Sequence, residues 1–235
     1  MTTARSRPLR AQLNLPKMIR NHPADPAMYI PQRFQQTDPD KVASFIKTHP
    51  FGALFSCDDK GTVIGTHLPF AMTNSPAGTL TLCSHLAKAN GQAGQLASRK
   101  VLVVFSGPHA YIPPRLYDSP VSVPTWNYIS IHLWGKCQLT VAEDSTQLMR
   151  RFIEEFDSSY LPVWETLPPE YIARMLANIV WFRIEVTETQ AAYKLSQNKT
   201  SIEQQRIADY LLTLGNDAAR DVGRAMKTNL SDSAG

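Results

Sequence analysis

The sequence predicts a mainly β fold with helices (α+β), in which a small antiparallel sheet curls toward a barrel. Short apolar segments separated by tight turn signals indicate antiparallel strands. Helical patterns occur only occasionally between them, which argues against a parallel sheet. The 235 residues are 43% hydrophobic and 19% charged, so one ordinary globular domain is expected.

The first 27 residues differ from the rest. They contain five cations and one anion, which leaves 19 cations and 19 anions from Met28 onward. They are rich in arginine and proline and have no sustained period, so we predict a loose basic extension over 1–27 and a single domain over 28–230. The neutral balance of that domain makes nucleic acid an unlikely partner, although the extension alone could still be a basic arm.

Each element follows from its local pattern. Residues 37–50 place Val42, Phe45 and Ile46 on one face after a capping residue and a proline, which predicts a short helix. The connection at 107–128 holds five prolines and is expected to lack regular structure. The other expected elements are strands at 51–57, 62–73, 79–84, 101–106, 128–141 and 180–195, a loop with a short helix at 85–98, and helices at 143–156, 168–179, 201–214 and 217–227.

Several function classes lose their support. The nucleotide fingerprints G-x-G-x-x-G and Walker A are missing, as are G-x-S-x-G and H-E-x-x-H. The three cysteines form no Cys-x-x-Cys pair, so neither a disulfide framework nor a metal site is expected; Cys83 and His85 more simply belong to packing. No apolar run reaches the roughly 20 residues of a membrane helix, and we expect no membrane partner and a cytoplasmic location.

Four clusters of polar and aromatic residues remain as candidate sites. GTHLPF holds Thr66 and His67 before Pro69, where unpaired backbone groups could bond a planar heterocycle, or where an ordinary edge strand could expose polar side chains. SHLAKAN, residues 84–90, stands where a strand passes into a helix, and it reads equally as a phosphate cradle or as a simple helix cap.

The other two clusters lie in the second half. Tyr111, Trp126 and Tyr128 offer flat surfaces for a ring or a partner subunit, or they pin a proline-rich loop to the core. KLSQNK, residues 194–199, offers several donors and acceptors but also suits an ordinary turn.

Read together, the motifs resemble the PaiB family of FMN-binding negative transcriptional regulators. One such motif would be weak, but seven occur in the family's order. They are MYIPQRF at Met28, HPFGALFS at His49, THLPF at Thr66, HLAKAN at His85, GPHAYIPP at Gly107, VPTWNY at Val123 and YKLSQNK at Tyr193.

The resemblance implies a split β-barrel related to flavin reductases and pyridoxamine-phosphate oxidases, with peripheral and C-terminal helices. It also implies a homodimer with FMN at the subunit interface, where one or both of the last two motifs come from the second subunit. The cofactor-binding residues that it implies are Thr66, His67, Leu68 and Pro69 along the ring, Ser84, His85, Lys88 and Asn90 at the phosphate, and Tyr111, Thr125, Trp126, Lys194, Gln197 and Asn198 closing the pocket.

The sequence also departs from the family pattern. Ser84 replaces a usual glycine, Lys88 a usual arginine and Leu116 a usual tryptophan. Lys88 keeps the charge but lacks the bidentate fork that arginine offers to phosphate.

Three functions stay open at this stage. The leading one is a flavin-dependent oxidoreductase with a small-molecule or nicotinamide electron donor, in which the flavin supplies the redox chemistry and no catalytic residue is predicted. The second is a regulator acting through DNA or a protein partner. The third is a haem-handling or general stress protein, since related split barrels host both activities, and His67, His85, His109 and His132 are each possible iron ligands.

Overall fold

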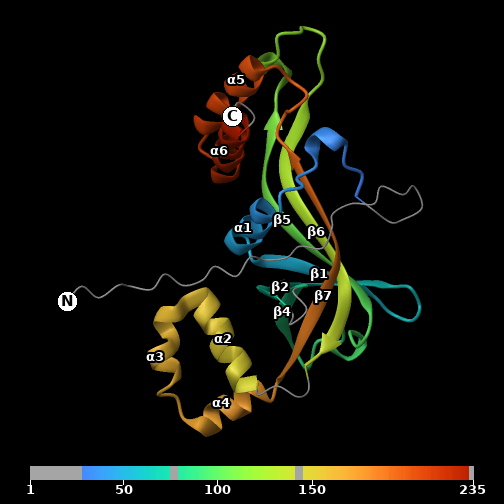
Figure 1. Ribbon diagram of the computed structural model, residues 1–235, viewed down its shortest axis with the longest axis vertical. Helices are drawn as coiled ribbons and strands as arrows, with labels where there is room; N and C mark the ends of the chain where they lie inside the picture. The colour runs from blue at the N-terminus through green and yellow to red at the C-terminus, as the bar shows by residue number, and fades with distance from the viewer. Residues whose placement is uncertain (1–27, 75–78, 141–144, 233–235) are drawn as a thin grey trace, which may run out of the picture.

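The computed structural model describes residues 28–74, 79–140 and 145–232, so the extension predicted at 1–27 lies outside the described residues. Seven antiparallel strands form one sheet in the order β2-β1-β5-β6-β7-β4-β3, as predicted (Figure 1). The strands are β1 (Phe51–Cys57), β2 (Val63–Pro69), β3 (Ala71–Asn74), β4 (Leu80–Ala87), β5 (Lys100–Ile112), β6 (Thr125–Leu139) and β7 (Ile179–Lys194).

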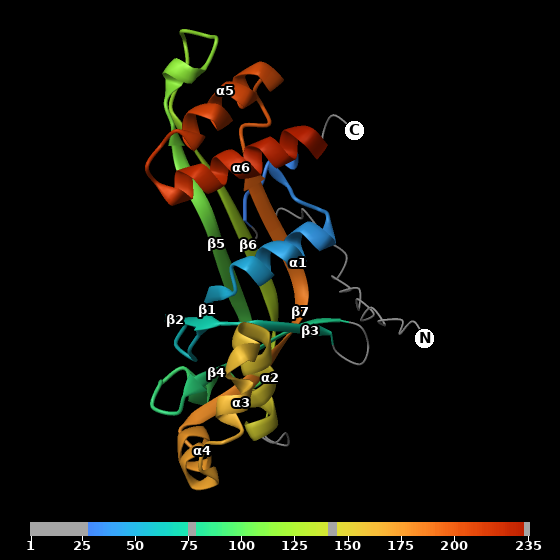
Figure 2. The same ribbon diagram turned by 90° about the vertical axis from the view of Figure 1, so that its left-hand side faces the viewer.

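The helices surround this sheet. In Figure 2, α1 and α6 cross the same face of β5, β6 and β7, with α5 beside α6 at the upper end, while α2, α3 and α4 form a separate group at the lower end. The α-helices are α1 (Pro39–Thr48), α2 (Ser145–Asp157), α3 (Leu161–Trp164), α4 (Pro169–Leu176), α5 (Ser201–Leu212) and α6 (Asp217–Asp232). Short 3-10 turns are η1 (Gln32–Phe34), η2 (Ala93–Gln95), η3 (Pro114–Leu116) and η4 (Ser158–Tyr160).

The inner face of the sheet, which carries Leu54, Val103 and Ile131, forms the core, and all three side chains are fully buried. Phe70, between β2 and β3, turns into this core and meets the Phe105 ring edge-on at 5.7 Å between centroids. Burying each such side chain stabilises the fold by roughly 1.5–3 kcal/mol relative to leaving it exposed. The predicted strand at 62–73 is therefore two strands, β2 and β3, because Phe70 leaves the ladder to fill the core.

The sheet curls until its edge strand β2 approaches β4, but the two strands share no ladder. Side chains close the gap: the Ser84 hydroxyl donates to the Pro69 carbonyl at 2.7 Å, and the Asn90 amide donates to the Thr66 hydroxyl at 3.2 Å. This barrel with one unzipped seam is the split-barrel fold that the motifs implied.

The expectation of an irregular connection over 107–128 is wrong. β5 continues to Ile112 and β6 begins at Thr125, so only residues 113–124 connect them. Pro108 is accommodated because the register shifts between Ser106 and His109, and a proline at a bulge removes no ladder hydrogen bond.

The helix expected after the SHLAKAN cluster is also absent from this part of the structure, apart from one short 3-10 turn. β4 runs to Ala87 and the chain then turns into the three-residue η2. SHLAKAN therefore belongs mostly to a strand, and the predicted helix N-terminus at this cluster is not formed. Among the described residues, no helix is long and apolar enough to cross a membrane.

Candidate functional site

The free edge of β2 is the first feature of the candidate site. Phe70 N donates to the Pro50 carbonyl at 2.9 Å and Asp58 N donates to the Thr62 carbonyl at 2.9 Å. These two bonds flank the β1–β2 ladder and fix its alternation, so the even-numbered residues of β2 bond to β1. The N–H and C=O groups of Gly65 and His67 therefore point to the unpaired edge, where Pro69 has no N–H to leave unsatisfied.

The outer face of the sheet, opposite the buried core, carries exposed rings beside this edge. The His67 ring stacks against Phe51 with 6.2 Å between centroids, and Phe51 is 62% exposed. Thr66 and Leu68 point the other way, toward the core, because neighbouring strand residues alternate between faces. Of the THLP motif, only His67 and Pro69 thus face outward.

The residues predicted at the phosphate also lie on different faces of the sheet. Ser84 is fully buried with its hydroxyl bonded to Pro69, and His85 lies on the opposite face of β4. Lys88 follows the strand, its backbone N–H bonded to the Asn178 carbonyl at 2.8 Å and its side chain exposed. Among the described residues, Lys88 has no acidic partner for its ammonium group. It is the cation of this cluster that is free to meet an anion.

His85 packs beneath α2. Its ring lies 4.7 Å from the Trp181 ring and 5.3 Å from the Phe152 ring, between centroids, and its Nδ1 has no hydrogen-bond partner. Burial lowers the pKa of His85 because the charged imidazolium would lose its water. The position therefore favours a neutral ring in a small hydrophobic cluster.

This burial predicts a pH effect on stability. The unfolded chain binds a proton at His85 more readily than the folded protein does, so the free energy of unfolding falls as pH drops below the ordinary value of 6.5. We expect His85→Leu to reduce the loss of melting temperature between pH 7.5 and pH 5.5. Part of the loss stays, because burial also lowers the pKa of His132.

The matched control is His67→Leu, at an exposed histidine on the same sheet. Thermal unfolding at both pH values measures the effect. An unchanged pH dependence in His85→Leu would show that this ring does not titrate against folding.

The second group of predicted residues lies near the tip of the β5–β6 hairpin. Tyr111 and Trp126 are cross-strand partners whose rings meet edge-on at 5.9 Å, and they are 47% and 53% exposed. Beside them the Lys194 ammonium donates to the Thr125 hydroxyl at 2.5 Å. This group offers a ring surface and a cation next to each other.

The polar side chains of the loop after β7 bond mostly to the loop's own backbone. The Gln197 amide accepts from Leu195 N at 2.7 Å and donates to the Tyr193 carbonyl at 2.5 Å. Ser196 adopts a positive φ of 65°, a conformation that non-glycine residues seldom take. Of the predicted pocket residues here, Asn198 is exposed and Gln197 holds the turn.

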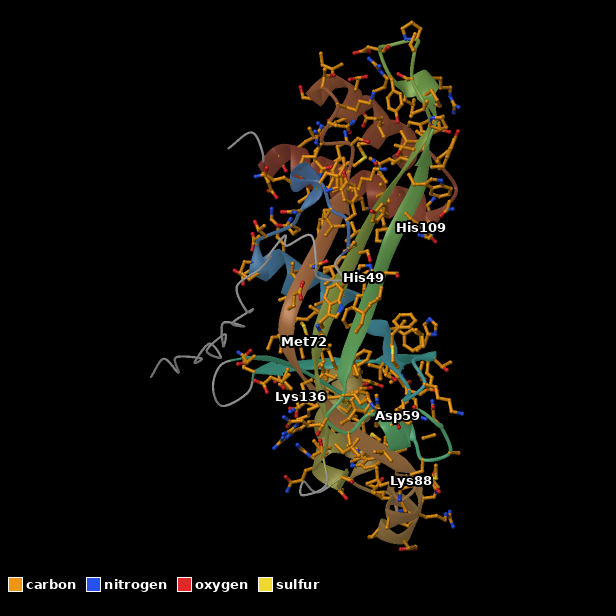
Figure 3. The ribbon with its side chains drawn as sticks, turned by 90° about the vertical axis from the view of Figure 1, so that its right-hand side faces the viewer. His49, Asp59, Met72, Lys88, His109 and Lys136 are labelled. Atoms are coloured by element: carbon orange, nitrogen blue, oxygen red, sulfur yellow. The ribbon has the colours of Figure 1, made fainter. Side chains whose placement is uncertain are left out.

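Within one chain the two groups do not meet. His67 pairs with Ala53 of β1, which is level with Val104 of β5 and His132 of β6, and Trp126 lies six residues from His132. That is roughly 20 Å along a strand. Figure 3 shows the same separation, with Lys88 at the lower end of the sheet and His109, which neighbours Trp126, in the upper half.

Two residues of this region were missed in the sequence. Phe51 opens β1 and exposes its ring, and nothing in an apolar segment distinguishes an exposed end from a buried one. Asn127 lies in VPTWNY but is fully buried, with its amide donating to the Ser196 hydroxyl at 2.9 Å. The alternation of β6, which places Trp126 and Tyr128 outward, is the signal that would have assigned Asn127 to the interior.

Comparison with known proteins identifies the family of this chain. The family model described as "Putative FMN-binding domain" matches residues 28–188. The "Protease synthase and sporulation protein PAI 2" of Bacillus subtilis is 34% identical over 208 residues, which cover 86% of this chain and 98% of that protein. An uncharacterized protein of Emericella nidulans is 24% identical over 242 residues, covering 85% of this chain and 96% of that one.

Solved structures show the same fold. The flavocytochrome Anf3 from Azotobacter vinelandii superposes with a TM-score of 0.53 at 17% identity, over 68% of this chain and 69% of that one. The FAD and heme binding protein from Mycobacterium smegmatis gives 0.54 at 13% identity, over 72% and 78%. Since the family match spans most of the chain and the Bacillus relative aligns along nearly its whole length, this protein belongs to the FMN-binding domain family that its motifs predicted.

Proposed function

We propose that two copies of this chain form a homodimer that holds FMN at two equivalent sites and works as a flavin-dependent oxidoreductase. Each site combines the β2–β4 seam of one subunit with the tip of the β5–β6 hairpin of the other. The single observation that carries the proposal is the separation of the two residue groups by roughly 20 Å along the sheet of one chain, which a second copy would bridge. The domain limits 28–230 and a cytoplasmic location belong to the same proposal.

The residues of the seam fit the cofactor. A flavin ring has donors and acceptors along its edge, and the unpaired N–H and C=O groups of Gly65 and His67 can meet them. The stacked rings of His67 and Phe51 supply a flat surface, and the exposed Lys88 ammonium suits a phosphate, although as a point charge without the fork of arginine. The seam itself is stabilised from the core side of the sheet by Thr66, Leu68, Ser84 and Asn90.

The chain's own contribution is binding and orientation. FMN, when bound, supplies the electron transfer chemistry. The seam residues fix the position of the ring, and Tyr111 and Trp126 of the partner copy cover it and exclude water. His85, beneath α2, keeps Lys88 at the end of a rigid strand, so its role is support.

The exposed apolar side chains of the outer face support the dimer. Phe51 and Val63 are 62% and 65% exposed, and Tyr111 and Trp126 belong to the same face of the sheet. Exposed apolar groups that cluster on one face mark interaction sites in soluble proteins. A two-fold axis through this face would place each end of the sheet against the opposite end of the other copy.

The test is to purify the protein, record its visible spectrum and mass in solution, and identify the chromophore released by denaturation. We expect a flavin band at about 450 nm, release of FMN and the mass of a dimer. A Soret band would instead indicate haem. Colourless protein that does not bind added FMN, or a monomer that binds it fully, would overturn the proposal.

The regulator alternative gains no specific support from the two C-terminal helices. In α6 the cations Arg220, Arg224 and Lys227 are paired with carboxylates, the last with Asp209 of α5 at 2.6 Å. Both helices pack one face into the main core. On the faces that remain exposed, the ion pairs neutralise these cations. DNA binding relies on unpaired cations facing the phosphates, and these helices offer few.

A further inference from the structure

A cavity of about 740 Å³ lies at the upper end of the molecule, between the 113–124 connection and the loop that follows β7. Its size lies within the range of small-molecule sites. Its floor includes the buried pair Asn127 and Ser196, which bond to each other at 2.9 Å. Its outer wall is the connection itself, with Val121 and Val123 91% and 79% exposed.

The charged residues that line this cavity are all positive. Two lysines, Lys194 and Lys199, belong to its wall, and none of the residues that line it is acidic. Lys194 donates to the neutral Thr125 hydroxyl, and the Lys199 ammonium lies 3.7 Å from the centroid of the Tyr117 ring. Neither lysine forms an ion pair with any residue that the structure describes.

The carboxylates closest in sequence are already engaged. Glu203 accepts from Asp118 N at 3.0 Å and from Thr200 N at 3.1 Å, and Asp118 pairs with Arg206 at 2.8 Å. Burial lowers the pKa of Lys194, as expected for an ammonium group without a counter-charge. Backbone hydrogen bonds from Asp118 and Thr200 lower the pKa of Glu203, and the charge of Lys199 adds to this effect, but Glu203 does not line the cavity. Two cations without an ion pair beside apolar walls form a site that lacks an anion.

We propose that this cavity binds a small organic anion. Its phosphate or carboxylate group binds to Lys194 and Lys199, with Thr125 and Asn198 as neutral donors, and its apolar part lies on Tyr117, Val121 and Val123. The anion site itself lies within one chain.

Isothermal titration at low salt tests the site with three anionic probes and one neutral probe. Pyrophosphate and NADPH carry phosphate, benzoate carries carboxylate, and benzamide is the uncharged partner of benzoate. We expect at least one anion to bind to the wild type, and Lys194→Met and Lys199→Met each to weaken it about tenfold, the loss of about one charge-assisted contact. Added salt should weaken the binding too.

Lys136→Met is the matched control, because this exposed lysine lies on β6 far from the cavity (Figure 3). The control should bind the anion within about twofold of the wild type, and benzamide binding should not respond to Lys194→Met. No binding of any anion, or equal affinity in the wild type and both cavity variants, would overturn the inference. Preference for NADPH and pyrophosphate over benzoate would identify the anion as a phosphate.

FMN content, measured on the same preparations, separates this inference from the proposed function. Full FMN content in Lys199→Met with weakened anion binding supports an anion site separate from the flavin. Loss of FMN in that variant would overturn the inference, because the lysine would then hold the cofactor. Wild-type protein that binds the anion but no FMN would support the anion site and overturn only the proposed function.

Discussion

Replacing Gly135 by alanine is expected to lower the free energy of unfolding by about 3 kcal/mol, the upper end for an added methyl group in a tightly packed site. Gly135 stands at the register shift of β6, where the β6–β7 ladder bends. A Cβ built there would lie 2.4 Å from the Glu185 carbonyl oxygen and 2.5 Å from Ile184 Cγ2. The backbone oxygen cannot move aside without breaking the ladder.

Thermal unfolding measures this effect. For a protein of this size, about 3 kcal/mol corresponds to a melting temperature lower by roughly 6–12 °C. Gly94→Ala is the matched control, because a Cβ at Gly94 meets no atom within 4 Å and φ there is not positive; it should change stability by less than about 0.5 kcal/mol. Equal melting temperatures for the two variants would show that the bulge accommodates the added methyl group at little cost in stability.

The effect extends to function because β6 spans the molecule. The bulge at Gly135 sets the direction of the strand that carries Trp126 at its other end. A residual shift of this strand displaces the hairpin tip relative to the seam. Gly135→Ala protein that still folds is therefore expected to hold less FMN than the Gly94→Ala control, through geometry alone.

Much of the fold was predictable because the core strands repeat simple patterns. The segment 51–57 and the helix at Val42, Phe45 and Ile46 follow from local periodicity, and both formed where expected. The error over 107–128 arises because the local pattern says nothing of the strand pairing around a proline. Pro108 reads as a strand breaker, but the bulge beside it turns the missing donor away from the ladder.

The site was less predictable than the fold. Motif order gave the residues, but the alternation of strands decides which of them share a face. Ser84 and His85 are neighbours in sequence and point to opposite faces, with Ser84 bonded to Pro69 and His85 packed on Trp181. This division depends on long-range pairing between β4 and its neighbours, which no local pattern contains.

Mixed dimers should recover half of the flavin that two separately defective variants lose. A seam variant, His67→Ala with Lys88→Ala, removes exposed groups of the first set. A tip variant, Tyr111→Ala with Trp126→Ala, removes the ring cover of the second. Each homodimer is expected to bind FMN about tenfold more weakly. A charge-assisted contact is worth about 1.5–3 kcal/mol, and each of the two lost ring contacts about 0.5–1.5 kcal/mol.

The recovery follows from the geometry of a site shared between subunits. In a dimer with one chain of each variant, both substitutions fall in the same site, and the second site is built wholly from unaltered residues. Co-expression with two different tags and purification on both isolates this heterodimer. Its FMN content at saturation should be about half that of the wild type, with the wild-type affinity.

A site contained within one chain gives a different result. Each heterodimer would then carry two sites, each with one defect, and neither would regain the wild-type affinity. Lys136→Ala paired with the tip variant is the control, because its lysine belongs to neither set; that heterodimer also keeps one intact shared site. Recovery with both pairings, and none in the seam or tip homodimers, would place each flavin between two chains, in agreement with the roughly 20 Å between the two groups.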